Sequence, residues 1–132
     1  MDTVQVKTKG RKDMVDITEK LNGIIQRKNV QDGVCHVFLP HTTAALTTGE
    51  MGEGTDKDFL EVAEEVIPKL KFRHAHDPSH AWSHMAASLI GGSLTLPVVN
   101  GELRLGTWQS VLLIELDGPR ERQMIVGFTP AA

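Results

Sequence analysis

The stretch SLTLPVVNGELRLGTWQSVLLIEL, residues 93–116, decides the fold expected for this chain. Its first half places Asn100-Gly101 between two alternating apolar runs, a strong signal for a two-residue β-hairpin. The second half, SVLLIEL, turns through DGPR (117–120) into a further strand-like run, RQMIVGF. From residue 93 onward the sequence therefore predicts strands joined by turns, which form an antiparallel sheet.

The residues before this stretch carry both strand and helix patterns. TVQVKTKG (3–10) alternates valine with polar residues, as a half-buried strand does, and VCHVFLP (34–40), apolar on both faces, predicts a central strand. KLKFRHAH (69–76) alternates again and predicts another strand. Helices are expected over DITEKLNGIIQRKNV (16–30) and TDKDFLEVAEEVIP (55–68), and the inward face of the second would carry Phe59, Val62, Ala63 and Val66.

A third helix is expected within DPSHAWSHMAASLIGG (77–92). Asp77 is a helix cap, Pro78 suits the first helical position, and Gly91-Gly92 is a stop signal. The sequence therefore predicts one α+β domain over residues 1–132, with an antiparallel sheet or sandwich and about three helices.

Composition narrows the function classes. The chain has 132 residues, of which 40% are hydrophobic, enough for one sizeable core. Its net charge of -3 gives no general attraction to nucleic acid or to an anionic membrane. The single cysteine, Cys35, cannot form an internal disulfide, and no apolar run is long enough for a membrane span. We expect a cytoplasmic protein with neither nucleic-acid nor membrane partners.

Histidines are the main candidates for chemistry, because HAHDPSHAWSH (74–84) holds four of the six. Neutral imidazole binds zinc and other transition metals, and three ligands from different elements leave an open coordination position. The sequence offers one histidine from a strand end, one from an expected strand and one from a helix: His41, then His74 or His76, then His80 or His84. Such spacings also arise without a metal, and His36 is expected to be a core histidine with a hydrogen-bonding neighbour.

Other side chains could act beside a metal. Glu50, in the loop expected over TTGEMGEG (47–54), could serve as a general base for a metal-bound water, or be an ordinary loop acid. Trp108 and Gln109 could line a pocket, or the tryptophan could pack at a bulge. Hydroxyl and guanidinium donors for a phosphate or carboxylate are available from Thr42, Thr43, Thr47, Thr48, Arg104, Arg120 and Arg122.

Four segments together resemble a known family over essentially the whole chain. They are HTTAALT (41–47), SHMAASLIGGSLTLPV (83–98), NGELRLGTWQSVLLIELDGPR (100–120) and the terminal RQMIVGF (122–128). Their order and spacing are similar to those of the YjbQ-like proteins, which are described as being of a secondary thiamine-phosphate-synthase type.

The resemblance implies an α+β subunit that forms a homotrimer, with a metal site built from histidines near the subunit boundary. It assigns the metal ligands to His41, His74 and His84, and a further role to Glu50. The chain departs from many relatives by having Gly49-Glu50-Met51 in place of Asn-Glu-Asn. It is also one residue shorter between His74 and His84, so His76 could take the place of His74.

Two functional hypotheses follow. In the first, the three histidines hold a divalent transition metal, with zinc foremost, and Glu50 handles a proton. Thr42, Thr43, Trp108 and Gln109 would contact a small phosphorylated ligand, with a weak thiamine-phosphate-synthase activity. Diphosphate chemistry usually relies on Mg²⁺ and oxygen ligands, so that activity is expected to be secondary. In the second hypothesis, the protein is a non-catalytic trimer that binds a metal or a small ligand.

Overall fold

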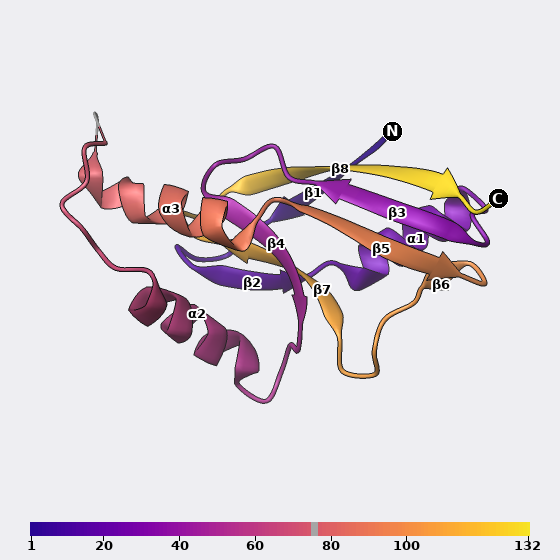
Figure 1. Cartoon of the computed structure of the whole chain (residues 1–132), viewed down its shortest axis with the longest axis horizontal. Helices are drawn as coiled ribbons and strands as arrows, with labels where there is room; N and C mark the ends of the chain where they lie inside the picture. Colours follow the sequence, from indigo (N-terminus) through magenta and orange to yellow (C-terminus); the bar gives the residue numbers. More distant parts are fainter. Residues whose placement is uncertain (75–76) are drawn as a thin grey trace.

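The computed structural model describes residues 1–74 and 77–132 and consists of two antiparallel sheets with helices packed against them (Figure 1). The larger sheet has the order β1 (Asp2–Lys7), β8 (Glu121–Pro130), β3 (Gly33–Phe38), β5 (Ser93–Val99) and β6 (Glu102–Leu103). The smaller sheet has the order β2 (Asp13–Asp16), β7 (Ser110–Glu115) and β4 (Ala44–Gly49). The predicted α+β class with antiparallel sheets in a single domain is confirmed.

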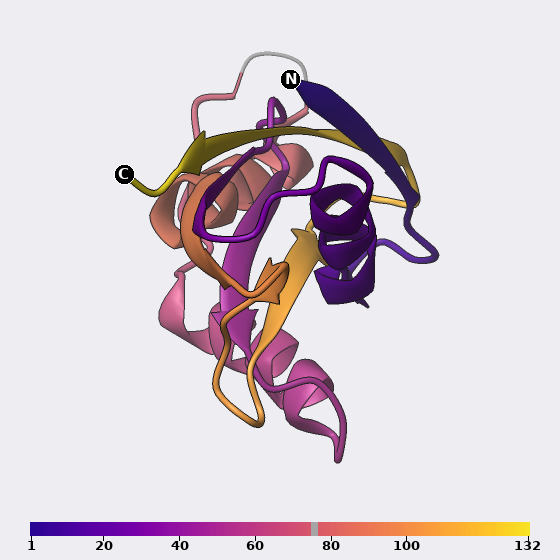
Figure 2. The same ribbon diagram turned by 90° about the vertical axis from the view of Figure 1, so that its right-hand side faces the viewer.

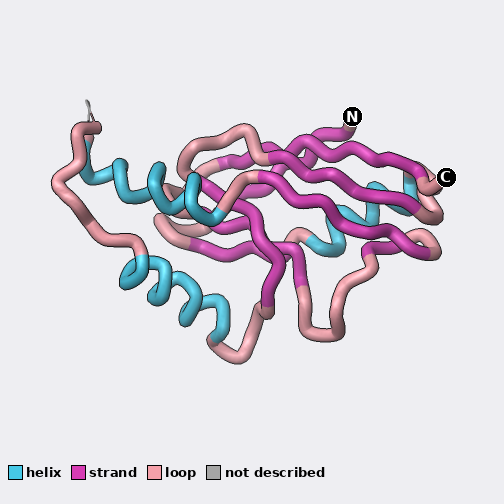
Figure 3. Tube along the Cα trace, in the orientation of Figure 1, coloured by secondary structure: helices cyan, strands magenta, loops and turns pink. Residues whose placement is uncertain are grey.

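Three helices and a short 3-10 turn complete the described part of the chain (Figure 3). They are α1 (Thr18–Arg27), α2 (Thr55–Val66), η1 (Pro78–His80) and α3 (Ala81–Ile90). Viewed along the strands, β8 arches above α1, whereas α2 lies on the far side of β4 and β7 (Figure 2). The smaller sheet therefore separates two hydrophobic clusters, one shared with α1 and the larger sheet and one shared with α2 and α3.

The sequence of strand β7 is apolar at nearly every position because both faces of this strand are buried. Successive side chains of a strand point to opposite faces. Val111 and Leu113 pack into the cluster beneath the larger sheet, whereas Leu112 and Ile114 pack against the α2 and α3 side. Both faces of β7 are therefore buried, as the run SVLLIEL requires.

The hairpin between β5 and β6 is confirmed. Asn100 and Gly101 have φ values of 53° and 81°, the left-handed conformations that a type I′ turn needs at both central positions. Strand β6 contains only Glu102 and Leu103, and the chain then leaves the sheet to reach β7.

Strand β3 is central in its sheet, but only one of its faces is covered. Cys35 and Val37 are buried, whereas Phe38 is 53% exposed. His36 is exposed as well, and its Nε2 lies 2.9 Å from Oγ1 of Thr129. The prediction of a core histidine at position 36 is wrong, because the two-sided burial expected for β3 belongs to β7 instead.

One prediction about α2 is confirmed in part, and one about the segment after it is wrong. Of the four residues expected on the inward face, Phe59 and Ala63 pack into the cluster shared with α3, together with Ile67 beyond the helix end. Val62 and Val66 are instead 56% and 70% exposed. Residues 69–74 form no strand, because this segment runs from the end of α2 toward η1 along the helix layer and pairs with neither sheet.

The expected helix signals at residues 77–92 are confirmed. Asp77 caps the 3-10 turn by accepting a hydrogen bond from the Ser79 N–H, Pro78 occupies the first position, and Gly91 ends α3 with φ 111°. Within the part of the chain that the structure describes, no helix has the length and apolar character needed to traverse a bilayer.

Candidate functional site

A cavity of about 440 Å³ lies at the end of the molecule where β3 ends and β8 begins. Histidines reach it from three parts of the chain: the β3–β4 connection, the segment before η1, and α3. The cavity is lined by Pro40, His41, Thr42, Thr43, His74, His80, His84, Asp117, Arg120 and Arg122. The structure therefore places the three histidines singled out as metal ligands in one cavity, together with His80, the alternative to His84.

His41 caps the end of the β3–β8 pairing. Strand β3 ends at Phe38 opposite Ile125, and the N–H of Gln123 donates to Nε2 of His41 at 3.0 Å. Burial lowers the pKa of His41, and the positive charge of Arg122 lowers it further. The neutral ring therefore carries its proton on Nδ1, and Nε2 could bind a metal only after giving up the backbone N–H.

His74 has the arrangement typical of a metal-binding histidine. Its Nδ1 lies 3.0 Å from the carbonyl oxygen of Asp77, which can only accept, so Nδ1 carries the proton. This leaves Nε2 with its lone pair, and metal-bound histidines usually donate their other N–H in this way. The ring stacks on His84, with centroids 4.9 Å apart and planes 28° apart.

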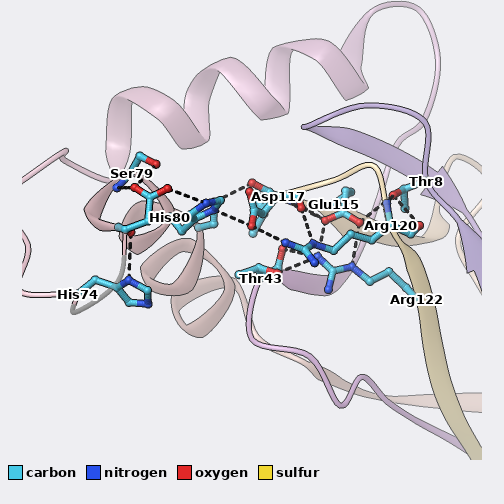
Figure 4. A network of polar contacts seen from close by, with 12 residues as sticks. Thr8, Thr43, His74, Ser79, His80, Glu115, Asp117, Arg120 and Arg122 are labelled. Carbon is cyan, nitrogen blue, oxygen red and sulfur yellow. Dashed lines mark hydrogen bonds and ion pairs between the residues drawn. The ribbon is translucent and has the colours of Figure 1, made fainter.

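His80 is held by carboxylates on both sides (Figure 4). Its Nδ1 lies 2.9 Å from Oδ2 of Asp117, and its Nε2 lies 3.0 Å from Oδ2 of Asp77. Hydrogen bonds from the Ser79 hydroxyl and backbone N–H lower the pKa of the Asp77 carboxyl. Because both nitrogens of His80 face carboxylates, this ring positions the turn rather than offering a free ligand atom.

A buried ion pair supports the floor of the cavity. Arg122 donates through Nε and Nη2 to the two oxygens of Glu115, at 2.8 and 2.5 Å, and both side chains are almost fully buried. Burial alone would raise the pKa of Glu115, but hydrogen bonds from Arg122, Thr8 and the Asp117 N–H hold it below its usual value. The pair is therefore charged at neutral pH.

Thr43 and Arg120 also form hydrogen bonds within the group of polar residues around this ion pair. Arg122 also donates to the carbonyl and hydroxyl oxygens of Thr43, at 3.1 and 2.8 Å, so this threonine faces the framework. Arg120 donates to the carbonyl and carboxylate of Asp117, at 2.7 and 3.1 Å. Its side chain is half exposed, and Thr42 is exposed beside it, so these two residues form the open rim.

The histidines do not form a ready-made chelate. Over residues 1–74 and 77–132, no three histidine, cysteine, aspartate or glutamate side chains are grouped closely enough to hold a metal ion. His74 and His84 already lie ring against ring, whereas His41 would have to turn. The alternative ligand His76 lies outside the described residues.

Glu50, Trp108 and Gln109 lie elsewhere. Strand β4 separates His41 from Glu50, and six residues of strand span roughly 20 Å. Glu50 accepts a hydrogen bond from Oγ1 of Thr55 at 2.9 Å and lines a separate hollow of about 270 Å³ with Met51, Glu53 and Trp108.

The sequence GTWQ forms the connection into β7. Trp108 is 78% exposed, so it does not pack in the core. Gln109 accepts from the Gly106 N–H and donates to Oγ1 of Thr48, both at 3.1 Å. This side chain therefore shapes its own loop and does not reach the histidines.

Glu115 and Asp117 were not singled out from the sequence. The signal for Glu115 was present, because it is the one charged residue in the apolar run SVLLIEL, and charged side chains are rarely fully buried without a partner. Asp117 belongs to the DGPR turn and carries no signal of its own.

Fold and cavity together define a class: a small α+β protein with two antiparallel sheets and a histidine-lined cavity at one end of the larger sheet. The chain belongs to the UPF0047 or YjbQ-like family, since the family model described as "UPF0047 protein YjbQ-like" matches residues 2–131.

Relatives and solved structures agree with this assignment. A UPF0047 protein of Archaeoglobus fulgidus is 40% identical over 92% of this chain and 94% of its own length. The UPF0047 protein YugU of Bacillus subtilis is 37% identical, over 92% and 93%. The crystal structure of an uncharacterized conserved protein of the family from Clostridium acetobutylicum has a TM-score of 0.89 at 35% identity, covering 98% of this chain and 100% of that chain. A YbjQ-like protein of unknown function from Sulfolobus solfataricus has a TM-score of 0.90 at 32% identity, covering 98% and 96%.

Proposed function

We propose that the histidine cavity binds a divalent transition metal, with zinc foremost, together with a small anionic ligand. The observation that carries the proposal is that His41, His74 and His84 line one open cavity, each from a different segment: the β3–β4 connection, the segment before η1, and α3. Imidazole nitrogens suit zinc and later transition metals, and an open cavity leaves room for water or a ligand in the remaining position.

The metal would be bound first by His74 and His84. Nε2 of His74 keeps its lone pair because Nδ1–H donates to the Asp77 carbonyl, and the stacked ring of His84 is adjacent. Binding by His41 requires its Nε2 to leave the Gln123 N–H. When bound, such a metal supplies a Lewis acid and lowers the pKa of a coordinated water.

The anionic ligand would be bound at the rim. Arg120 is half exposed and Thr42 lies beside it, so a guanidinium and a hydroxyl can donate to phosphate or carboxylate oxygens. This chemistry is compatible with a small phosphorylated ligand and with a weak thiamine-phosphate-synthase-type reaction. We place this reaction in the cytoplasm. The support is Cys35, a buried free thiol whose pKa burial raises to about 11, because cytoplasmic proteins usually keep their cysteines reduced.

The proposal includes self-association as a homotrimer. Glu50 lies at the opposite end of β4 from the histidines, so a neighbouring copy would have to supply this carboxylate as a base. The highly exposed Trp108 beside Glu50 is an apolar surface that a second copy would cover.

A non-catalytic metal-binding trimer is the second candidate. It is favoured by the distance between Glu50 and the cavity, because among the residues that the structure describes the cavity is lined by no general base other than the histidines and the paired Asp117.

The test is zinc titration by isothermal calorimetry on protein stripped with a chelator. We expect one zinc per chain in the wild type and strongly weakened binding in His74→Ala and His84→Ala. His36→Ala is the matched control, because this histidine is exposed on β3, where its Nε2 pairs with the hydroxyl of Thr129. Equal zinc binding by His84→Ala and wild type would refute the proposal.

The two candidates separate in further measurements on the same samples. Formation of thiamine phosphate from its pyrimidine diphosphate and thiazole phosphate precursors, lost in Glu50→Gln, would favour the enzyme. Zinc binding with no turnover, and a trimer that dissociates on chelation when analysed by light scattering, would favour the non-catalytic role.

A further inference from the structure

A second cavity, of about 480 Å³, lies on the other side of the η1 turn from the histidines. Its walls come from the connection between β1 and β2, the segment after α2 and the start of α3. The lining residues that matter here are Arg11, Lys12, Lys69, Phe72 and Trp82. None of the five histidines in the described part of the chain lines this cavity.

The cavity carries an excess of positive charge. Arg11, Lys12 and Lys69 supply three cations, and over residues 1–74 and 77–132 the carboxylate that forms ion pairs with them is Glu64, which contacts both lysines. Burial lowers the pKa of Lys12, and the neighbouring charges of Lys69 and Arg11 lower it further. The three like charges therefore repel one another, and a bound anion would relieve this repulsion.

The wall of the cavity is aromatic. Trp82 is only 5% exposed, and its Nε1 donates to the carbonyl oxygen of Ile67 at 2.8 Å, which fixes the plane of the ring. Nζ of Lys12 lies 4.5 Å from the centroid of this ring. Phe72, half-buried, adds a second ring to the lining. Cations beside fixed aromatic surface match a ligand with an anionic group on a flat apolar body.

We propose that this cavity is a binding site for a small organic anion, with a phosphate or carboxylate attached to a planar ring. The anionic group would contact Lys12, Lys69 and Arg11, and the ring would lie against Phe72 and Leu70, next to the small part of Trp82 that is exposed. The volume is within the range of small-molecule sites. The site is separate from the histidine cavity and does not depend on a metal.

Phenyl phosphate is the probe, and the fluorescence of Trp82 is the readout. The chain has two tryptophans, so the Trp108→Phe variant leaves Trp82 as the only indole. In the presence of a chelator, we expect phenyl phosphate to change the Trp82 emission saturably. Inorganic phosphate, which lacks the ring, should bind roughly tenfold more weakly.

Charge variants in the same background locate the site. We expect K12Q to weaken phenyl phosphate binding roughly tenfold. R11Q and K69Q should weaken it roughly threefold, because their charges are more exposed to solvent. K20Q, on the exposed side of α1, makes the same charge change away from the cavity and should leave binding unchanged. Arg11 is exposed, so R11Q keeps the test decisive even if K12Q fails to fold.

Three results would overturn the proposal. They are the absence of any saturable change, an equal loss in K20Q and R11Q, and loss of binding in His84→Ala, which would place the ligand in the histidine cavity instead.

Discussion

The buried Glu115–Arg122 pair and the histidine cavity lie next to each other at one end of this molecule (Figure 4). They differ in how many of their polar atoms form hydrogen bonds within the chain. The carboxylate of Glu115 accepts hydrogen bonds from Thr8, Arg122 and the N–H groups of Leu116 and Asp117. In the histidine cavity, by contrast, Nε2 of His74 has no hydrogen-bonding partner among the described residues. The first region is closed on itself, and the second is left open.

The difference separates stability from binding. A buried charge pair whose hydrogen bonds are all made inside the chain has nothing left to offer a ligand, but removing one partner leaves an uncompensated buried charge. Removing a partly exposed imidazole costs little folding stability. Such a ring nevertheless keeps a nitrogen atom that can bind a metal or a ligand.

The largest expected effect is on folding, from Glu115→Gln. The substitution leaves the charge of Arg122 buried without its partner, so we expect a loss of about 3–5 kcal/mol in the free energy of unfolding. Urea unfolding followed by circular dichroism measures it. Glu121→Gln, exposed at the start of β8, is the matched control and should change stability by less than about 0.5 kcal/mol. A loss below about 1 kcal/mol for Glu115→Gln would show that the buried pair does not stabilise the fold.

Acidification should remove part of the same stabilisation. The pKa of Glu115 is lower in the folded chain than in the unfolded one, so its contribution is complete above the unfolded value, about 4.5. It is lost as the pH falls through the folded pKa. We expect the stability difference between wild type and Glu115→Gln to shrink below pH 4.5 in urea titrations. A difference that stays constant down to pH 3 would contradict the lowered pKa.

The histidine variants should show the opposite pattern. His74→Ala and His84→Ala should weaken zinc binding more than about a hundredfold, since removal of an outer hydrogen-bonding partner alone costs 10–100-fold. Their free energy of unfolding without metal should change by less than about 1 kcal/mol, because both rings are only partly buried. Calorimetry and urea unfolding on the same samples make the comparison, and a large loss of stability would place these rings in the scaffold.

A smaller effect is expected from Thr8→Val. The Thr8 hydroxyl donates to Glu115 at 2.8 Å and accepts from the Arg120 N–H at 2.9 Å. Its loss should cost about 1–2 kcal/mol of stability while leaving zinc affinity unchanged. A fall in zinc affinity with intact stability would show that the network tunes the cavity.

The smallest expected effect is from Glu50→Gln. Because Glu50 lies beyond the far end of β4, the zinc affinity of a single chain should remain within about twofold of the wild type. Light scattering should accompany the measurement, since a loss of affinity confined to the trimer would show that a neighbouring copy supplies this carboxylate.

Much of the fold could be predicted because its signals are local. The Asn100-Gly101 turn and the Gly91 helix stop both depend on backbone conformations that few other residues adopt easily. The failures come from long-range packing. Residues 69–74 alternate like a strand but form none, because no other strand pairs with them. His36 is exposed because no layer of the described residues covers that face of β3.

The site could be predicted only in part, for the same reason. The pattern of histidines offered His41, then His74 or His76, then His80 or His84, and the resemblance selected His41, His74 and His84, which do line one cavity. Glu50 is close to His41 in sequence, but an intervening strand carries it away. No local pattern reveals that Gln123 occupies Nε2 of His41 or that two aspartates hold His80.

The most direct test of the account is the position of a bound zinc ion in crystals grown with one equivalent of zinc, located by anomalous diffraction at the zinc absorption edge. The account predicts a peak about 2.0–2.1 Å from Nε2 of His74, with His84 and a turned His41 completing the ligands. A peak at His36 or elsewhere on the surface, with the histidine cavity free of anomalous signal, would contradict it.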